Sequence, residues 1–326
     1  MTTSAGLLTG TDPALQGSVN RGLEQVEARL HEVVTSAHPM LTEAAAHLVD
    51  AGGKRFRPLL ALLAAHLGDG ISSDVVDAAV VVELTHLATL YHDDVMDEAN
   101  VRRGAESANT RWTNTVAILT GDYLFARASD LTAGLGTEAT HLQSRTFARL
   151  VEGQIAETAG PLDGQDPIEH HLQVLADKTG SLIATSARLG ALTAGADRRL
   201  VDTVAEYGEL IGVAFQLSDD LIDVLSDSGQ SGKTPGTDLR EGVATLPVLL
   251  GHDDPALMSV VRADLSSDAA LDVALRALRA HPALELARGR LTSYVDRARE
   301  IARTLPEGPA RDALLALADY VLARTG

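Results

Sequence analysis

Two copies of the pattern Asp-Asp-x-x-Asp, about 120 residues apart, constrain the fold of this 326-residue chain most strongly. The first copy begins at Asp93 and the second at Asp219, and each ends an apolar stretch. Residues four apart on a helix lie one above the other, so Asp97 shares a face with Asp93, and Asp223 with Asp219. Such carboxylates repel each other unless a cation lies between them. The pair of motifs therefore predicts two helices that face each other across a cavity and hold Mg²⁺ between them.

A single motif of this kind also fits a solvated acidic helix end, and one copy alone would not decide between the two explanations. Two copies argue against the solvated helix end, because carboxylates are almost never buried without a partner. Magnesium ions, with phosphate groups as further ligands, would supply the compensating charge.

The rest of the chain predicts an all-α fold. Apolar residues recur at helical spacing, no stretch shows convincing β alternation, and Gly and Pro mark short breaks. Aromatic residues make up only 3%, so Ala, Leu and Val must fill the core, which favours closely packed helices. The predicted helical ranges are about 19–49, 58–67, 73–97, 113–134, 138–160, 169–194, 198–227, 241–250, 257–280, 285–303 and 309–324.

No linker and no repeat divides the chain clearly. Residues 1–17 are rich in small side chains and are expected to form a flexible arm, followed by one all-α domain over 18–326. The chain has no cysteine, which excludes disulfides, thiolate metal sites and cysteine nucleophiles.

The net charge of −18 argues against nucleic acid as a partner, because phosphate backbones are bound by positive faces. A small anionic substrate remains compatible if cations bridge it to the acidic groups. The first 20 residues do not form a signal peptide, and no apolar run reaches the length of a membrane-spanning helix. We therefore expect a soluble, cytoplasmic protein.

A basic cluster follows Gly52-Gly53 and comprises Lys54, Arg55 and Arg57. It lies where a helix is expected to begin, and helix N-termini together with Arg side chains favour phosphate. The alternative is a solvated turn with chance cations. His86 lies two turns before Asp93 among apolar neighbours, so a buried core histidine competes with a functional role for it.

Taken together, the motifs GGKRFRP, HDDVMDE with RRG, KTG, FQLSDDLID and GKTPGTDLREG resemble those of the trans-isoprenyl diphosphate synthases, or polyprenyl synthetases, of long-chain type. The motifs extend from about residue 50 to 247. The resemblance implies an isoprenoid synthase-type bundle of about ten or more helices around a deep central cavity, usually as a homodimer. It also implies an Mg²⁺-dependent transferase that condenses isopentenyl diphosphate head-to-tail with an allylic diphosphate, farnesyl or geranylgeranyl diphosphate.

The resemblance also implies roles for particular residues. The catalytic residues would be Asp93, Asp94, Asp97, Lys178 and Asp219. About two or three Mg²⁺ ions would be held by Asp93, Asp97, Asp219 and Asp223. Isopentenyl diphosphate would be bound by Lys54, Arg57, His86 and Arg103. The allylic diphosphate would be bound by Arg102, Lys178, Thr179, Gln216 and Lys233. The chain departs from the family where Val243 stands in place of a common lysine, so no phosphate contact is expected from that position.

Product length is expected to depend on the helix that leads to Asp93. One helical turn rises about 5.4 Å, close to the length of one extended isoprene unit. In short-chain members a large aromatic residue often closes the tunnel at the positions held here by the small Ala88 and Thr89. The tunnel floor is then expected deeper, near Leu84, with Tyr91 pointing away from the tunnel. This predicts a product of roughly thirty to fifty carbons by family analogy, such as the precursor of a quinone side chain. Release of so long a product would involve peripheral association of the protein with a membrane.

Three alternatives remain open at this point. The protein could be a shorter-chain geranylgeranyl diphosphate synthase or a non-catalytic subunit of a heteromeric synthase. It could also be a terpene cyclase, although the second Asp-Asp-x-x-Asp motif and the Gly-Gly-Lys motif argue against a cyclase. Intact aspartates in both motifs argue against a non-catalytic subunit.

Overall fold

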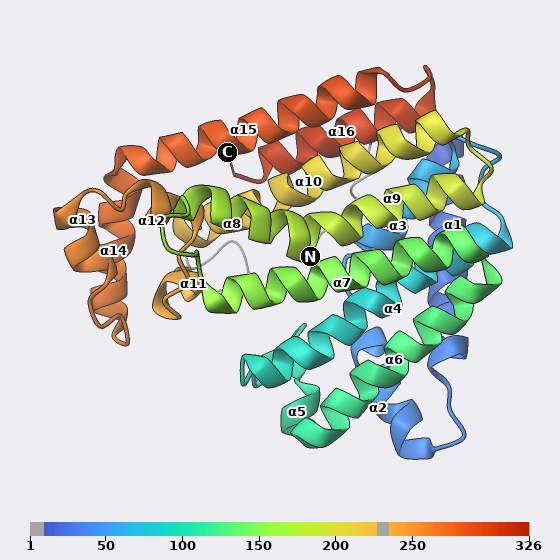
Figure 1. Cartoon of the computed structure of the whole chain (residues 1–326), viewed down its shortest axis with the longest axis horizontal. Coiled ribbons are helices and arrows are strands. Elements are labelled where there is room, and N and C mark those ends of the chain that lie inside the picture. Colours follow the sequence, from blue (N-terminus) through green and yellow to red (C-terminus); the bar gives the residue numbers. More distant parts are fainter. Residues whose placement is uncertain (1–9, 227–234, 326) are drawn as a thin grey trace. The chain divides into compact units, whose positions relative to one another are not determined.

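Helices form most of the computed structural model, which describes residues 10–226 and 235–325 (Figure 1). The prediction of an all-α fold is confirmed. The helices are α1 (Pro13–Val34), α2 (Pro39–Asp50), α3 (Phe56–Ala65), α4 (Ser73–Met96), α5 (Ala108–Arg111), α6 (Asn114–Gly134), α7 (Thr137–Ala159), α8 (Pro167–Leu175), the π-helical turn η2 (Ala176–Gly180), α9 (Ser181–Thr193), α10 (Arg198–Leu225), α11 (Thr237–Arg240), α12 (Leu246–Leu250), α13 (Pro255–Val261), α14 (Asp268–Ala280), α15 (Pro282–Arg303) and α16 (Pro309–Ala323).

Contacts divide the chain into two compact units. The first unit contains the residues up to 148 with 182–208 and 302–316, and the second contains 149–181, 209–301 and 317–326. Helices α7, α9, α10, α15 and α16 contribute residues to both units. The prediction of one domain over residues 18–326 stays a prediction.

The core of the first unit is built on α3 and α4. Nearly every residue of α3 is buried, and α4 packs against α1, α3 and α6. Small residues bring the helices into close contact: a Cβ added at Gly190 of α9 would overlap the backbone of Ala61 in α3. This is the packing expected from a composition poor in aromatic residues, and it fixes α4, which carries the first aspartate motif.

The second unit contains the C-terminal part of α10, which carries the second aspartate motif, and α8 with η2 packed next to each other. Two of its short helices, α8 and α13, begin at capping side chains. Asp166 accepts hydrogen bonds from the first-turn amides of α8, and Asp254 does the same for α13. These caps satisfy backbone N–H groups that have no partner within the helix.

Some predicted boundaries were wrong. The helix expected over 19–49 is divided into α1 and α2 at residues 35–38, because Pro39 starts a new helix and cannot donate a backbone hydrogen bond to the preceding turn. Helix α1 begins at Pro13, so residues 13–17 are helical and not part of a flexible arm. Asp12 caps this helix by accepting a hydrogen bond from Leu15 N at 2.9 Å.

Three further stretches are more interrupted than their apolar patterns indicated. The range 169–194 contains the π-helical turn η2, 241–250 contains a break between α11 and α12, and 257–280 is divided into α13 and α14. A short antiparallel hairpin, β1 (Val101–Arg102) and β2 (Ala105–Glu106), follows α4, where no strand was expected. Strands of two residues are too short to show alternation.

Candidate functional site

The first aspartate motif lies at the C-terminal end of α4. Asp94 is fully buried, and Arg102 Nε donates a hydrogen bond to its Oδ1 at 2.6 Å. Its Oδ2 is buried and has no hydrogen-bond partner among the residues that the structure describes. Burial raises the pKa of the Asp94 carboxyl, and the bond from Arg102 opposes that rise. Asp97 is the exposed C-cap residue, and its N–H donates to Asp93 O at 2.8 Å.

The hairpin that follows α4 sends its two arginines to different partners. Arg103 and Gly104 form its two-residue turn, with φ of 54° and 79°. Positive φ at both positions suits a tight hairpin turn of type I′. Arg102 pairs with Asp94, whereas Arg103 NH1 donates to Leu48 O at 3.0 Å and also to Gly52 O. The hairpin therefore connects the aspartate motif to the turn between α2 and α3.

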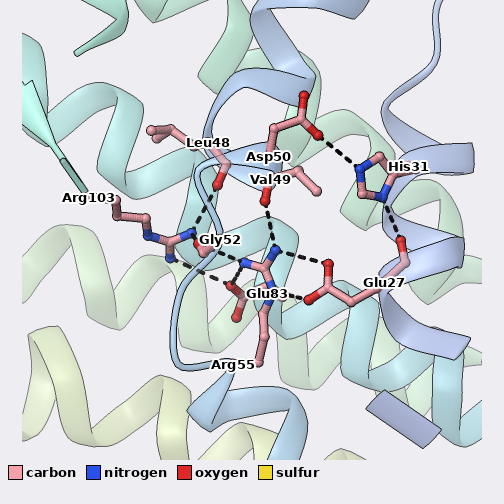
Figure 2. A network of polar contacts seen from close by, with 9 residues as sticks. All are labelled: Glu27, His31, Leu48, Val49, Asp50, Gly52, Arg55, Glu83 and Arg103. Carbon is pink, nitrogen blue, oxygen red and sulfur yellow. Dashed lines mark hydrogen bonds and ion pairs between the residues drawn. The ribbon is translucent and has the colours of Figure 1, made fainter. Parts of the chain in front are cut away.

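That turn carries the basic cluster, and its arginines differ in their surroundings. Arg55 is buried, with a left-handed φ of 44°, and its guanidinium contacts Glu27 and Glu83, as Figure 2 shows. Arg57 Nε, in contrast, is buried and has no hydrogen-bond partner within residues 10–226 and 235–325. Lys54 is exposed. Arg55 thus holds the turn in place, while Arg57 has a donor free for a ligand.

His86 lies on α4 in the field of these cations. Burial, and then the charges of Arg57 and Arg103, lower the pKa of His86 well below its ordinary value, so it is neutral at pH 7. Burial also lowers the pKa of Arg57 to about 10, against the opposing effect of Glu83. The positive charges gathered in this unit repel one another, so a bound anion would stabilise them. Of the four residues predicted to bind isopentenyl diphosphate, the structure brings three together: Arg57, His86 and Arg103.

The residues expected to control product length differ in exposure. Leu84 and Ala88 have no exposed surface, whereas Thr89, one turn before Asp93, is partly exposed. Tyr91 points toward α2: its hydroxyl donates to a backbone carbonyl and accepts from Leu48 N at 3.3 Å. Their roles in chain length stay predictions.

In the second unit, each aspartate of the second motif has its own partner. Asp219 is paired with Arg324, whose guanidinium lies 4.1 Å from the ring centre of Phe215. Asp220 is buried and accepts from Leu246 N at 3.2 Å, with His171 Nε2 at 3.1 Å from the same oxygen. The roles of Arg324 and His171 had no sequence signal, because both are distant in sequence and lie outside any motif.

Asp223 continues this pattern, because Thr237 N donates to its Oδ1 at 3.0 Å. This bond joins α10 to the start of α11, just beyond residues 227–234. Lys233, predicted to bind the allylic diphosphate, lies outside the described residues. Val243 is exposed, and the absence of a phosphate contact there stays a prediction.

The Lys-Thr-Gly motif lies in the π-helical turn η2. Lys178 Nζ is 2.5 Å from a carboxylate oxygen of Glu157, and Thr179 Oγ1 lies 3.5 Å from Gln216 Oε1 on α10. The structure therefore brings together Thr179 and Gln216, two residues predicted to bind the allylic diphosphate. Such π-helical turns are frequent at functional sites.

An ion-pair network that the sequence did not indicate supports this turn. Arg149 donates to Asp177, the neighbour of Lys178, and forms a two-pronged contact with Glu209 through NH1 at 3.0 Å and NH2 at 2.6 Å. Gln173 donates to Asp177 at 2.7 Å.

The first motif belongs to the first unit and the second motif to the second unit. Their predicted pairing across a cavity stays a prediction. Within residues 10–226 and 235–325, no group of three or more His, Asp or Glu side chains is arranged to hold a metal ion.

Comparisons with known proteins agree with the motifs. The sequence model of the family described as "Polyprenyl synthetase" matches residues 38–278. The chain is 45% identical to a nonaprenyl diphosphate synthase of Mycobacterium tuberculosis, over the full length of both chains. It is 40% identical to a dimethylallyltranstransferase of the same organism, over 96% of this chain and 97% of the other.

Solved structures of prenyl diphosphate synthases are also similar to this chain. One of geranylgeranyl pyrophosphate synthase from Corynebacterium glutamicum, complexed with calcium and isoprenyl diphosphate, has a TM-score of 0.87 at 43% identity. That match covers 97% of this chain and 98% of the other. A decaprenyl diphosphate synthase from Rhodobacter capsulatus has a TM-score of 0.87 at 34% identity, with 96% and 99% covered.

Proposed function

The chain belongs to the polyprenyl synthetase family. We propose that it is a long-chain, head-to-tail prenyltransferase that extends farnesyl or geranylgeranyl diphosphate with isopentenyl diphosphate. The observation that carries this proposal is the gathering of Arg57, His86 and Arg103 on the unit that also carries the first aspartate motif. A cation cluster with a free donor suits a diphosphate.

The cation cluster is proposed to hold the diphosphate of isopentenyl diphosphate, with exposed Lys54 added from the turn. Neutral His86 can donate one N–H to a phosphate oxygen. The Nε–H of Arg57, which has no hydrogen-bond partner in the described part of the chain, is proposed to contact the diphosphate directly. Arg102, Lys178, Thr179, Gln216 and Lys233 are proposed to contact the allylic diphosphate.

Magnesium is proposed as the cofactor, with about two or three ions held by the aspartates of both motifs, Asp93, Asp97, Asp219 and Asp223. The residues fit this ion, because they offer hard carboxylate oxygens. Next to Asp93, Asp94 Oδ2 is buried and has no hydrogen-bond partner among the described residues. When bound, magnesium would stabilise the charge that develops on the leaving diphosphate. The pairs Arg102–Asp94 and His171–Asp220 would fix the orientation of the two motifs' middle carboxylates.

In the proposed reaction, the bond between the allylic carbon and its diphosphate oxygen breaks. The double bond of isopentenyl diphosphate attacks that carbon, and a proton then leaves the new chain. We assign this proton to the released diphosphate rather than to a side chain. Apolar surroundings along the growing chain would keep water from the cationic carbon.

We propose a product of roughly thirty to fifty carbons, because Ala88 and Thr89 are both small and Tyr91 points toward α2. The second candidate is a shorter-chain geranylgeranyl diphosphate synthase, which the structural match to the Corynebacterium glutamicum enzyme favours. A quinone side chain is the proposed destination of the longer product.

A homodimer is proposed as the working form. Ile118 and Leu119 on α6 are 42% and 59% exposed, and such apolar side chains on a helix suit contact with a second copy. In the part of the chain that the structure describes, no helix has the length and apolar character needed to cross a bilayer. We place the reaction in the cytoplasm, with peripheral membrane association during release of the long product.

The test is incubation of the purified protein with radiolabelled isopentenyl diphosphate, farnesyl diphosphate and Mg²⁺, with and without a chelator. We expect label in the butanol extract only when Mg²⁺ is available. Arg57→Gln should raise the KM for isopentenyl diphosphate about tenfold or more, whereas Arg29→Gln, at an ion pair with Asp77, should not. No extracted label under any condition would contradict the proposal and favour a non-catalytic subunit.

A further inference from the structure

A buried carboxylate lies beneath the cation cluster. Glu83 is only 1% exposed, although it is on α4 one turn before His86. Carboxylates are rarely buried so completely without a specific partner. Arg55 NH1 donates to Glu83 Oε1 at 2.9 Å, and Arg103 NH2 lies 3.6 Å from the same oxygen.

The two arginines reach Glu83 from different segments of the chain. Arg55 comes from the turn before α3, and Arg103 comes from the tip of the hairpin after α4. Both also donate to Gly52 O, so the two guanidiniums share two partners, the Gly52 carbonyl and the Glu83 carboxylate, as Figure 2 shows. Three segments therefore meet at this point: the turn, the hairpin and α4 itself.

Both arginines have left-handed backbones, with φ of 44° at Arg55 and 54° at Arg103. Residues other than glycine seldom adopt this conformation, and it persists where the surroundings enforce it. Glu27 holds Arg55 from the other side, through contacts of 2.5 Å at Nε and 3.1 Å at NH2. The side-chain contacts are thus positioned to enforce the backbone of both segments.

We propose that Glu83 is a positioning residue for isopentenyl diphosphate. Its carboxylate fixes the guanidinium of Arg103 directly, and through Arg55 it fixes the turn that carries Lys54 and Arg57. This inference rests on the proposed function, because it assumes that the cation cluster binds that diphosphate. Glu83 touches no substrate in this account and acts only through the arginines.

The sign of the effect distinguishes positioning from simple electrostatics. Glu83→Gln removes a negative charge close to the cluster, and by charge alone this would strengthen binding of an anion. If Glu83 positions the arginines, its loss should instead weaken binding, because Arg103 and the turn lose their common partner. The two explanations predict changes of KM in opposite directions.

The experiment measures KM for each substrate and kcat in the full-length protein. We expect Glu83→Gln to raise the KM for isopentenyl diphosphate about tenfold, the size seen when groups that orient direct ligands are removed. The KM for the allylic substrate should change less than twofold. Glu83→Asp, which keeps the charge on a shorter side chain, should give an intermediate KM.

Asp77→Asn is the matched control. Asp77 is also on α4 and also pairs with an arginine of another segment, Arg29 of α1, at 2.8 Å. A general loss of stability at α4 would affect both variants, whereas the selective rise in KM should occur only in Glu83→Gln. Thermal denaturation of both variants supplies the comparison of stability.

An unchanged or lower KM for isopentenyl diphosphate in Glu83→Gln would overturn the inference. If that variant does not fold, Glu83→Asp and Glu27→Gln carry the test. Glu27 is 41% exposed, and its replacement loosens Arg55 from the solvent side. An unchanged KM in both would also overturn it. Failure of the proposed function looks different, because the wild-type protein itself would then not consume isopentenyl diphosphate.

Discussion

A methyl group added at Gly53 should disturb the cation cluster without removing any charge. Gly53 has φ of 144°, a region that side-chain-bearing residues rarely adopt. A Cβ built there would lie 2.9 Å from Arg103 Cζ, 3.0 Å from NH1 and 3.1 Å from NH2. Gly53→Ala should therefore push the Arg103 guanidinium away from Glu83.

The neighbouring Gly52 provides a control of nearly the same chemistry. Its φ is 77°, and a Cβ built there meets nothing within 4 Å. Gly52→Ala should cost about 1–2 kcal/mol through the left-handed backbone alone. Gly53→Ala should cost about 1–3 kcal/mol for its backbone, with a further cost for moving Arg103. For a chain of this size, each kcal/mol lowers Tm by roughly 2 °C.

Steady-state kinetics with varied isopentenyl diphosphate measures the functional part. We expect the KM for isopentenyl diphosphate to rise about tenfold in Gly53→Ala, which corresponds to about 1.4 kcal/mol of lost binding. The rise in Gly52→Ala should be much smaller. Equal KM values in the two variants would refute the reasoning, because the clash with Arg103 would then have no consequence.

Two further predictions concern α4. Thr89→Phe should shorten the product at similar turnover, because Thr89 is partly exposed one turn before Asp93. Ala88→Phe should also shorten the product, but it should cost about 1–3 kcal/mol of stability by overpacking a fully buried position. Chain-length analysis should show no shift for Tyr91→Phe, and an unchanged product in both larger variants would show that this face does not line the tunnel. Because the folded pKa of His86 lies below its unfolded value of about 6.5, the unfolded chain binds the extra proton and stability falls as pH drops below about 6.5. His86→Gln should reduce this loss of stability at low pH, as measured by denaturation at several pH values. His31→Gln should increase the loss, because the pKa of His31 is raised by bonds to the Glu27 carbonyl and Asp50. Equal pH profiles of stability in the wild type and both variants would contradict both assignments.

The helices and the aspartate motifs were accessible to sequence analysis because both depend on local spacing. The period of the apolar residues predicted α4 and α10, and residues four apart share a face wherever a helix forms. The order of the motifs was enough to indicate the family. The division at Pro39 could also have been predicted, since proline removes the backbone donor that a continuous helix needs.

The division of roles within the basic turn could not be predicted. The sequence does not distinguish the roles of the neighbouring basic residues Lys54, Arg55 and Arg57. Arg55 holds the turn in place only because Glu27 and Glu83, each 28 residues away in sequence, contact its guanidinium. Contacts of this separation leave no periodic trace.

For a related reason, the sequence did not indicate that the two hairpin arginines contact different partners. Strands of two residues carry no alternation, and the left-handed turn at Arg103 is unusual for a residue with a side chain. Likewise, Arg324 reaches Asp219 from 105 positions along the chain, without any motif around it.

The length of the product made by the wild-type protein tests the central claim most directly. Purified protein should be incubated with radiolabelled isopentenyl diphosphate, Mg²⁺ and farnesyl or geranylgeranyl diphosphate, and the dephosphorylated products separated by chain length. We expect all-trans products of roughly thirty to fifty carbons by family analogy, formed by head-to-tail addition. A product that stops at geranylgeranyl diphosphate from farnesyl diphosphate would contradict the long-chain assignment.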